Sequence, residues 1–153
     1  MDISTIIKSA LEESSMVSSK MSLDKDFILQ LNKASNLLIE TFRVKGKVLL
    51  AGNGGSAADC QHIAAEFMGR LNFDREPLPA VSLTTNTSNL TCIANDYGYE
   101  QIFTRQLQAL ACSNDSLIVY STSSNECDAV GINLIKIIPL GTTGYTTIEQ
   151  NKL

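Results

Sequence analysis

The sequence predicts an α/β fold in which helices cover both faces of a central parallel sheet. Short apolar runs of the kind that form buried strands occur at residues 48–51, 80–83, 117–120 and 132–138. Helical patterns separate the first three of these runs. A glycine-rich turn, Gly52-Asn-Gly-Gly-Ser56, leads directly from the first run into a helix. Ligands of such sheets bind beyond the carboxyl ends of the strands, so we expect a site at this turn.

Length and composition indicate one globular domain over residues 1–153. The chain is 44% hydrophobic and 18% charged, with a net charge of −4. An acidic chain without a basic run is not expected to bind nucleic acid, and no segment approaches the ~20 apolar residues that span a membrane. The cysteines show no C-x-x-C spacing and no signal peptide precedes them, which is typical of reduced thiols in the cytoplasm. These cysteines are Cys60, Cys92, Cys112 and Cys127.

Residues 1–44 are expected to form a helical segment ahead of an α/β core at 45–153. The first helix is predicted over residues 1 to about 20, and the second after Ser22 or Asp24, either of which can cap it. Two helices that precede the sheet cannot both bury their apolar faces on it. We expect them to pack on each other or on another subunit, which favours an oligomer. The apolar faces consist of Ile3, Ile6, Ile7, Ala10 and Leu11 in the first helix and Phe27, Ile28, Leu31, Ala34, Leu37, Leu38 and Phe42 in the second.

The glycine-rich turn and the helix after it carry the residues best suited to chemistry. Ser56 is expected to cap a helix that ends at Gly69, and the amide groups at such a helix start favour a phosphate. His62 and Glu66 are four positions apart and therefore lie on one face of that helix. The turn is neither a Walker A loop nor G-x-G-x-x-G. The alternatives are a tight turn that binds no ligand and a surface histidine paired with its neighbour.

Two hydroxyl-rich turns follow later strands. Thr84-Thr-Asn-Thr-Ser88 comes after the second apolar run, and Ser121-Thr-Ser-Ser-Asn125 comes after the third. Because the carboxyl ends of parallel strands meet at one edge of a sheet, the two turns and the glycine turn favour a polyol-phosphate pocket. The alternative is that these side chains bond their own backbone, as is common in turns. Between the two turns we expect a short helix at 89–94, a turn at 95–98 and a helix at 100–111.

These segments resemble the sugar-isomerase (SIS) domain family, from the N-terminal helices to about Asn125. The resemblance is dense over residues 51–66, 78–85 and 93–100. It implies a three-layer, flavodoxin-like fold whose N-terminal helices serve oligomerisation, in a homotetramer with sites at subunit contacts. It also implies aldose–ketose isomerisation through an enediol, in which sedoheptulose 7-phosphate becomes D-glycero-D-manno-heptose 7-phosphate, a precursor of bacterial lipopolysaccharide.

The resemblance assigns roles to residues that match the family motifs. Glu66 is the implied catalytic base, and it is also an implied ligand of the substrate. His62 and Glu66 are the implied ligands of one zinc ion per site. The other implied substrate-binding residues are Asn53, Gly54, Gly55 and Ser56 of the glycine turn, Asn95 and Asp96 for the sugar hydroxyls, and Ser121, Thr122 and Ser123 for the phosphate.

The sequence departs from the family pattern in its last part. Ser124 stands where the family phosphate loop has glycine, and Glu126 stands where it has serine, so a carboxylate would repel phosphate there. His62 is the only histidine, whereas a C-terminal motif of the family supplies a glutamine and a second histidine. Residues 132–139 followed by 146–150 resemble the last family strand and the start of its final helix. Alternatively, residues 136–141 match the preceding strand.

We therefore expect the core to lack family segments after about residue 125 and at its C-terminus, or the sequence to belong to a longer protein. Two other functions stay open. One is a non-catalytic SIS-domain protein that binds a partner in replication initiation, and the other is a sensor of a sugar phosphate. The absent second histidine favours the partner-binding protein. The His62/Glu66 pair with Asn95 and Asp96 favours the isomerase.

Overall fold

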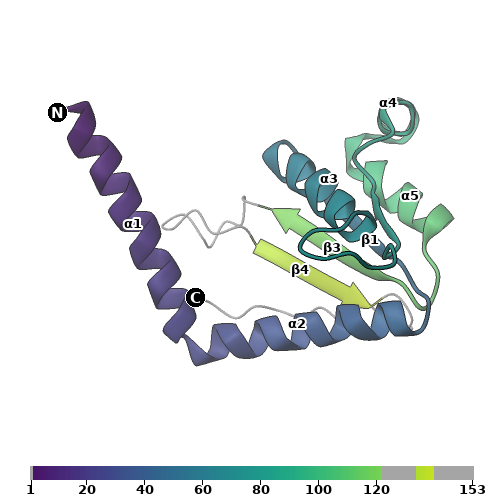
Figure 1. Ribbon diagram of the computed structural model, residues 1–153. Coiled ribbons are helices and arrows are strands. Elements are labelled where there is room, and N and C mark those ends of the chain that lie inside the picture. Colours follow the sequence, from purple (N-terminus) through teal and green to yellow (C-terminus); the bar gives the residue numbers. More distant parts are fainter. Residues whose placement is uncertain (1, 122–133, 140–153) are drawn as a thin grey trace. The chain divides into compact units, whose positions relative to one another are not determined.

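The computed structural model describes residues 2–121 and 134–139 (Figure 1). The chain forms two units, Met1–Asn36 and Leu37–Leu153. The boundary falls inside the second helix, so the end of that helix belongs with the sheet. Thr41 from this end is buried and shares a 2.6 Å hydrogen bond with Ser116, a residue of the sheet.

Both N-terminal helices form as the sequence predicts. They are α1, Ile3–Leu23, and α2, Lys25–Arg43. Asp24 caps α2, because its Oδ1 accepts hydrogen bonds from the backbone amides of Asp26 and Phe27 at 2.9 and 3.0 Å. None of the 21 residues of α1 is buried. Its exposed large apolar side chains include Ile3, Ile6, Ile7, Leu11 and Met16.

The sheet has four strands in the order β2-β1-β3-β4. Strand β1, Val48–Gly52, runs parallel to its neighbours β2, Ala80–Ser82, and β3, Ser116–Ser121. The predicted fold class is confirmed in these three strands. All five residues of β1 are buried, as expected of a strand covered on both faces.

The fourth strand differs from the expected parallel arrangement. Strand β4, Leu134–Pro139, pairs with β3 in the antiparallel direction, with Leu117 opposite Ile138 (Figure 1). A parallel return normally needs a crossover helix. Only twelve residues, 122–133, separate the two strands, and their sequence lacks a periodic apolar face. Twelve residues are about the shortest connection for a parallel crossover, whereas an antiparallel pairing needs no crossover.

Helices pack on both faces of the sheet. On one face, Leu49 and Leu117 form a core with Leu83, against which Phe103 and Leu107 of α5, Ile102–Leu110, pack. Successive strand residues point to opposite faces, so Gly52 and Leu50 face the other side. There α3, Gly55–Met68, lies on the sheet and buries Cys60 and Ala64. The helix ends before Gly69, as predicted.

The region after β2 corrects one expectation. Helix α4 extends over Thr87–Tyr97, so Asn95 and Asp96 lie in its last turn and not in a turn of their own. Asn86 sets the start, because its side chain accepts a 3.0 Å hydrogen bond from the amide of Asn89. Gly98 ends the helix with a φ of 94°. A short 3-10 helix η1, Tyr99–Gln101, then leads into α5.

Candidate functional site

The glycine turn, residues 52–56, joins β1 to α3 in a conformation that requires glycine at two positions. A Cβ on Gly52 would lie 2.9 Å from the carbonyl oxygen of Ser56, which is too close. Gly54 has φ 56° and ψ −124°, a region that side-chain-bearing residues rarely adopt. The predicted N-cap at Ser56 is wrong. Helix α3 begins at Gly55 with Gly54 in the capping position, and Ser56 is buried in the first turn.

A pocket of about 250 Å³ opens beside this turn. It lies at the carboxyl ends of β1 and β3, where the sheet topology predicts a ligand site. Asn53 and Ser56 from the glycine turn and Ser121 from β3 are the predicted site residues that the pocket brings together. Gly54 and Gly55 belong to the same turn but are not among its lining residues. Thr122 and Ser123 lie outside the described residues. The complete lining is Ala51, Gly52, Asn53, Ser56, Phe103, Val119, Tyr120 and Ser121.

The sequence analysis did not anticipate the apolar part of this lining. Phe103 comes from α5, and Val119 and Tyr120 come from the end of β3. Burial raises the pKa of the Tyr120 hydroxyl, and the nearby Cys60 and Asp59 raise it further. Tyr120 therefore stays neutral at physiological pH. The only sequence signal for Val119 and Tyr120 was their place at the end of an apolar run that enters a hydroxyl-rich turn.

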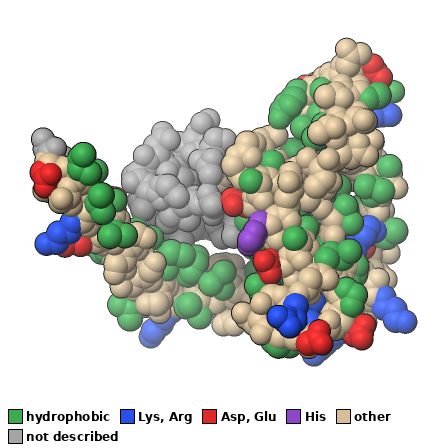
Figure 2. Space-filling view, turned by 45° about the horizontal axis from the view of Figure 1, so that its top comes forward, with side chains coloured by type: hydrophobic (Ala, Val, Ile, Leu, Met, Phe, Trp, Pro, Cys, Tyr) green, Lys and Arg blue, Asp and Glu red, His purple; other side chains and the backbone are tan. Residues whose placement is uncertain are grey.

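His62 and Glu66 form the predicted pair on α3. The distance between His62 Nε2 and Glu66 Oε1 is 3.5 Å. The His62 side chain is 73% exposed, and Figure 2 shows this histidine in purple at the surface. Glu66 is more sheltered, with 33% of its side chain exposed. The pair is thus preformed and reachable from solvent.

The spacing of this pair suits a zinc ion. Two donor atoms of a tetrahedral zinc ion lie about 3.4 Å apart, given zinc–ligand distances of about 2.1 Å. The 3.5 Å between the imidazole nitrogen and the carboxylate oxygen is close to that value. Among the described residues, no group of three or more His, Cys, Asp or Glu side chains could hold a metal. The described part of the chain would thus supply two ligands.

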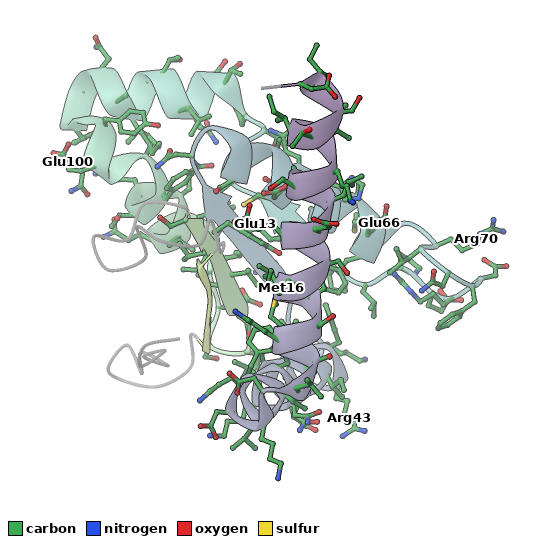
Figure 3. The ribbon with its side chains drawn as sticks, turned by 90° about the vertical axis from the view of Figure 1, so that its left-hand side faces the viewer. Glu13, Met16, Arg43, Glu66, Arg70 and Glu100 are labelled. Carbon is green, nitrogen blue, oxygen red and sulfur yellow. The ribbon has the colours of Figure 1, made fainter. Side chains whose placement is uncertain are left out.

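The His62/Glu66 pair does not line the pocket. Glu66 lies eleven positions after Gly55 on α3, which is about 16 Å along the helix axis at 1.5 Å per residue. Figure 3 shows Glu66 on this helix and Arg70 in the segment that follows. The structure therefore places the predicted phosphate-binding turn and the predicted base at opposite ends of one helix.

Arg75 holds the end of α3 that carries Glu66. Its guanidinium donates hydrogen bonds to the backbone carbonyls of Glu66 at 2.8 Å, Phe67 at 2.9 Å and Glu76 at 3.0 Å. The amide of Leu78 also donates to the carbonyl of Phe67, at 3.0 Å. Carbonyls at a helix end lack partners within the helix. Arg75 thus fixes the last turn of α3 to the segment that follows it.

Asn95 and Asp96 are exposed in the last turn of α4, next to each other. The side-chain amide of Asn95 donates a 2.9 Å hydrogen bond from Nδ2 to Asp96 Oδ1. The Cys92 thiol donates a hydrogen bond to Asp96 Oδ2 at 3.5 Å. A residue of the following η1, Tyr99, donates from its hydroxyl to Asn53 Oδ1 at 2.7 Å. This bond joins the segment after α4 to the glycine turn, and sequence reasoning missed it.

The first hydroxyl-rich turn has a structural role at Thr84. The Thr84 hydroxyl is buried, accepts a 3.0 Å hydrogen bond from Gln61 Nε2 and lies 2.8 Å from the hydroxyl of Ser82. Thr85 donates to the carbonyl of Ser82 at 3.1 Å. Thr85 and Asn86 thus bond nearby backbone, which is the alternative given for this turn, whereas Thr84 bonds α3 and the Ser82 side chain. They do not line the described pocket.

Comparisons with known proteins identify the family. The profile of the SIS domain matches residues 14–134. The chain is 53% identical over 119 residues to a phosphoheptose isomerase of Burkholderia pseudomallei (strain 1710b), which covers 78% of this chain and 60% of the relative. It is 45% identical over 151 residues to a phosphoheptose isomerase of Aneurinibacillus thermoaerophilus, covering 96% and 76% respectively.

Solved structures agree with this result. The structure of a phosphoheptose isomerase from Francisella tularensis has a TM-score of 0.71 and 32% identity, covering 80% of this chain and 63% of that one. The structure of a phosphoheptose isomerase from Neisseria gonorrhoeae has a TM-score of 0.65 and 37% identity. The match covers 83% of this chain and 66% of that one. This chain spans about 60% of the length of the Burkholderia relatives. The profile covers most of the sequence, so the chain belongs to the SIS domain family.

Proposed function

We propose that this protein isomerises a phosphorylated heptose and converts sedoheptulose 7-phosphate to D-glycero-D-manno-heptose 7-phosphate, for lipopolysaccharide precursor synthesis. The observation that carries the proposal is the His62–Glu66 pair, 3.5 Å apart on a helix that starts at a glycine turn beside a pocket. Relatives named phosphoheptose isomerase support it, among them one that is 53% identical over 119 residues. They do not favour a non-catalytic partner-binding protein or a sugar-phosphate sensor.

The pocket suits the phosphate end of such a substrate. The amide groups at the start of α3 and the hydroxyl groups of Ser56 and Ser121 are donors for phosphate oxygens. We assign Thr122 and Ser123 to the same role. Gly54 and Gly55 let the backbone approach the ligand, because neither carries a side chain and a Cβ built on either meets no atom within 4 Å. Asn53, Asn95 and Asp96 are assigned to the sugar hydroxyls.

Glu66 is the proposed base. Isomerisation through an enediol removes a proton from the carbon beside the carbonyl and returns it to the neighbouring carbon. A partly sheltered carboxylate whose main chain is fixed by Arg75 can hold this proton between the two steps. His62 and Glu66 are the proposed ligands of one zinc ion, with further ligands from outside the described residues. A bound zinc ion would polarise the carbonyl and so acidify the proton that Glu66 removes.

We also propose that the protein works as a homo-oligomer, a tetramer by family resemblance, in the cytoplasm. A base must lie within hydrogen-bond reach of the proton that it removes. Glu66 is about 16 Å along α3 from the glycine turn of its own chain, so it is better placed to serve the pocket of another copy. The exposed apolar side chains of α1 are a suitable contact surface. No helix among the described residues is long and apolar enough to cross a membrane.

The test is conversion of sedoheptulose 7-phosphate, followed by the appearance of the aldose in NMR spectra. We expect activity that a chelator reduces and that added zinc restores. Glu66→Gln keeps the size of the side chain but removes its basicity, and we expect a loss of about 100-fold or more in kcat. The control is Glu76→Gln, an exposed carboxylate beyond the helix, with activity unchanged. Activity retained in Glu66→Gln, or none in the wild type, would contradict the proposal.

A further inference from the structure

The hydrogen bond from the Tyr99 hydroxyl to Asn53 Oδ1 joins two segments that are 46 residues apart in the sequence. At 2.7 Å it is a hydrogen bond of ordinary length for two oxygen atoms, between two exposed side chains. Water competes for such groups, so the bond adds little to the stability of the fold. What it does determine is the orientation of the Asn53 side chain.

Because the side-chain oxygen of Asn53 already accepts this bond, only the N–H donors of its side-chain amide are available to a ligand. Asn53 Oδ1 accepts from Tyr99, so Nδ2, with two N–H groups, is the part of the side chain that a ligand can use. Among the side chains and carbonyls of residues 2–121, none accepts a hydrogen bond from Nδ2. Asn53 also lines the pocket. We propose that Tyr99 is a positioning residue, which holds the Asn53 amide so that Nδ2 donates to an oxygen of the bound sugar phosphate.

The backbone around Tyr99 places it for this role. Gly98 ends α4 with a φ of 94°, which turns the chain directly from Asn95 and Asp96 into η1. The amide of Gln101 closes this turn by donating to the Gly98 carbonyl at 3.1 Å. Tyr99 therefore connects the end of α4 to the glycine turn. Both segments are substrate-binding in the proposed function, on which this inference rests.

Loss of the Tyr99 hydroxyl would release the amide to rotate. A freely rotating amide presents its acceptor oxygen to the ligand part of the time, and it must be reordered on binding. Asn53 would contact the substrate in both the ground state and the transition state, so the effect falls on KM. For Tyr99→Phe we expect KM to rise by about tenfold and kcat to stay within about twofold.

Tyr97→Phe is the matched control. Tyr97 is also an exposed tyrosine, two positions earlier, and the Arg105 guanidinium lies 3.7 Å from the centre of its ring. Its hydroxyl makes no hydrogen bond within the described part of the chain. Tyr97→Phe should therefore leave KM unchanged, and both variants should keep the wild-type melting temperature. Equal KM values for the two variants would overturn the proposal.

A double-mutant cycle separates positioning from a direct role of the hydroxyl. If Tyr99 acts through Asn53, Tyr99→Phe should have no further effect on KM in an Asn53→Ala background. The same tenfold effect in both backgrounds would overturn the proposal.

Two readouts do not depend on catalysis. Tyr99→Phe, but not Tyr97→Phe, should shift the side-chain amide signals of Asn53 in NMR spectra of the free protein. It should also weaken the calorimetric affinity for sedoheptulose 7-phosphate. A wild-type protein that binds this compound without converting it, together with weaker binding in Tyr99→Phe, would contradict the proposed isomerase and support the positioning role. Unchanged Asn53 signals would overturn the positioning role, whether or not the protein is an isomerase.

Discussion

Asp115 binds Lys47 through both of its carboxylate oxygens. Oδ1 accepts a 2.9 Å hydrogen bond from the backbone amide of Lys47, and Oδ2 lies 2.5 Å from its ammonium nitrogen. Oδ2 also accepts from the amide of Cys112 at 2.7 Å. Lys47 directly precedes β1 and Asp115 directly precedes β3, so this one carboxylate joins the amino ends of the two central strands.

The first prediction concerns Asp115→Asn. Asp115 is 4% exposed, and its replacement leaves the Lys47 charge without its partner, so we expect the free energy of unfolding to fall by about 2 kcal/mol. Urea denaturation at pH 7 measures this difference. Asp74→Asn changes an exposed aspartate and should leave the midpoint unaltered. An equal loss in both variants would contradict the role of the Lys47 pair.

The same pair predicts a pH dependence. Burial raises the pKa of Asp115, but the hydrogen bonds from Lys47 and Cys112 outweigh it and hold the pKa below its ordinary value of 3.8. A carboxylate with a lowered pKa in the folded state stabilises that state above the unfolded-state pKa. This contribution is lost as the pH falls through the folded-state value. The difference between wild type and Asp115→Asn should therefore be constant near pH 7 and shrink below about pH 4. A constant difference down to pH 2 would contradict the assignment.

The glycine turn predicts unequal effects at two adjacent glycines. Gly54→Ala forces a side chain into φ 56°, ψ −124°, and we expect a loss of about 2 kcal/mol in the free energy of unfolding. Gly55 has no such backbone conformation, and a Cβ there meets no atom within 4 Å. Gly55→Ala should be neutral or slightly stabilising, because alanine favours the helix that begins there. Thermal denaturation distinguishes the two, and equal losses would contradict the geometry of the turn.

The zinc proposal predicts the metal content of His62 variants. His62→Ala removes one of the two zinc ligands proposed among the described residues, so zinc per chain after dialysis should fall at least tenfold, as measured by mass spectrometry of the metal. The melting temperature of the metal-free protein should not change, because 73% of the side chain is exposed. Glu76→Gln serves as the control. Wild-type zinc content in His62→Ala would exclude His62 as a ligand.

The described cysteines should differ in reactivity. Cys60 is fully buried, and burial together with Asp59 raises its pKa to about 11. Cys92 is exposed, but its hydrogen bond to Asp96 raises its pKa. In a Cys127→Ser background at pH 8, iodoacetamide should modify exposed Cys112 first, Cys92 more slowly and Cys60 only after unfolding. Asp96→Asn should accelerate the reaction of Cys92. Peptide mass spectrometry gives the order, and rapid labelling of folded Cys60 would contradict it.

Local patterns predicted the parts of the site that one segment forms by itself. The buried run at 48–51, the helix that ends at Gly69 and the four-residue spacing of His62 and Glu66 are properties of neighbouring residues. The structure confirms each of them. The fold class followed from the alternation of such segments, and the structure confirms it for the three parallel strands.

Contacts between distant residues were not predictable in this way. Ser56 has the chemistry of an N-cap, but the helix starts two residues earlier, after Gly54, and the serine is buried in its first turn. Asn95 and Asp96 favour turns by composition, yet they complete a helix that Asn86 caps at its start. No local pattern shows that Tyr99 reaches Asn53, because that bond depends on how two segments meet in space.

Helix α3 carries the glycine turn at its first residue and Glu66 three positions before Gly69. An α-helix is stiff along its axis, because a hydrogen bond at every residue resists stretching. A ligand that draws the glycine turn along this axis would therefore carry the carboxylate with it by a similar amount. The position of the glycine turn and the position of the Glu66 carboxylate, at the two ends of α3, are thus mechanically linked within each chain.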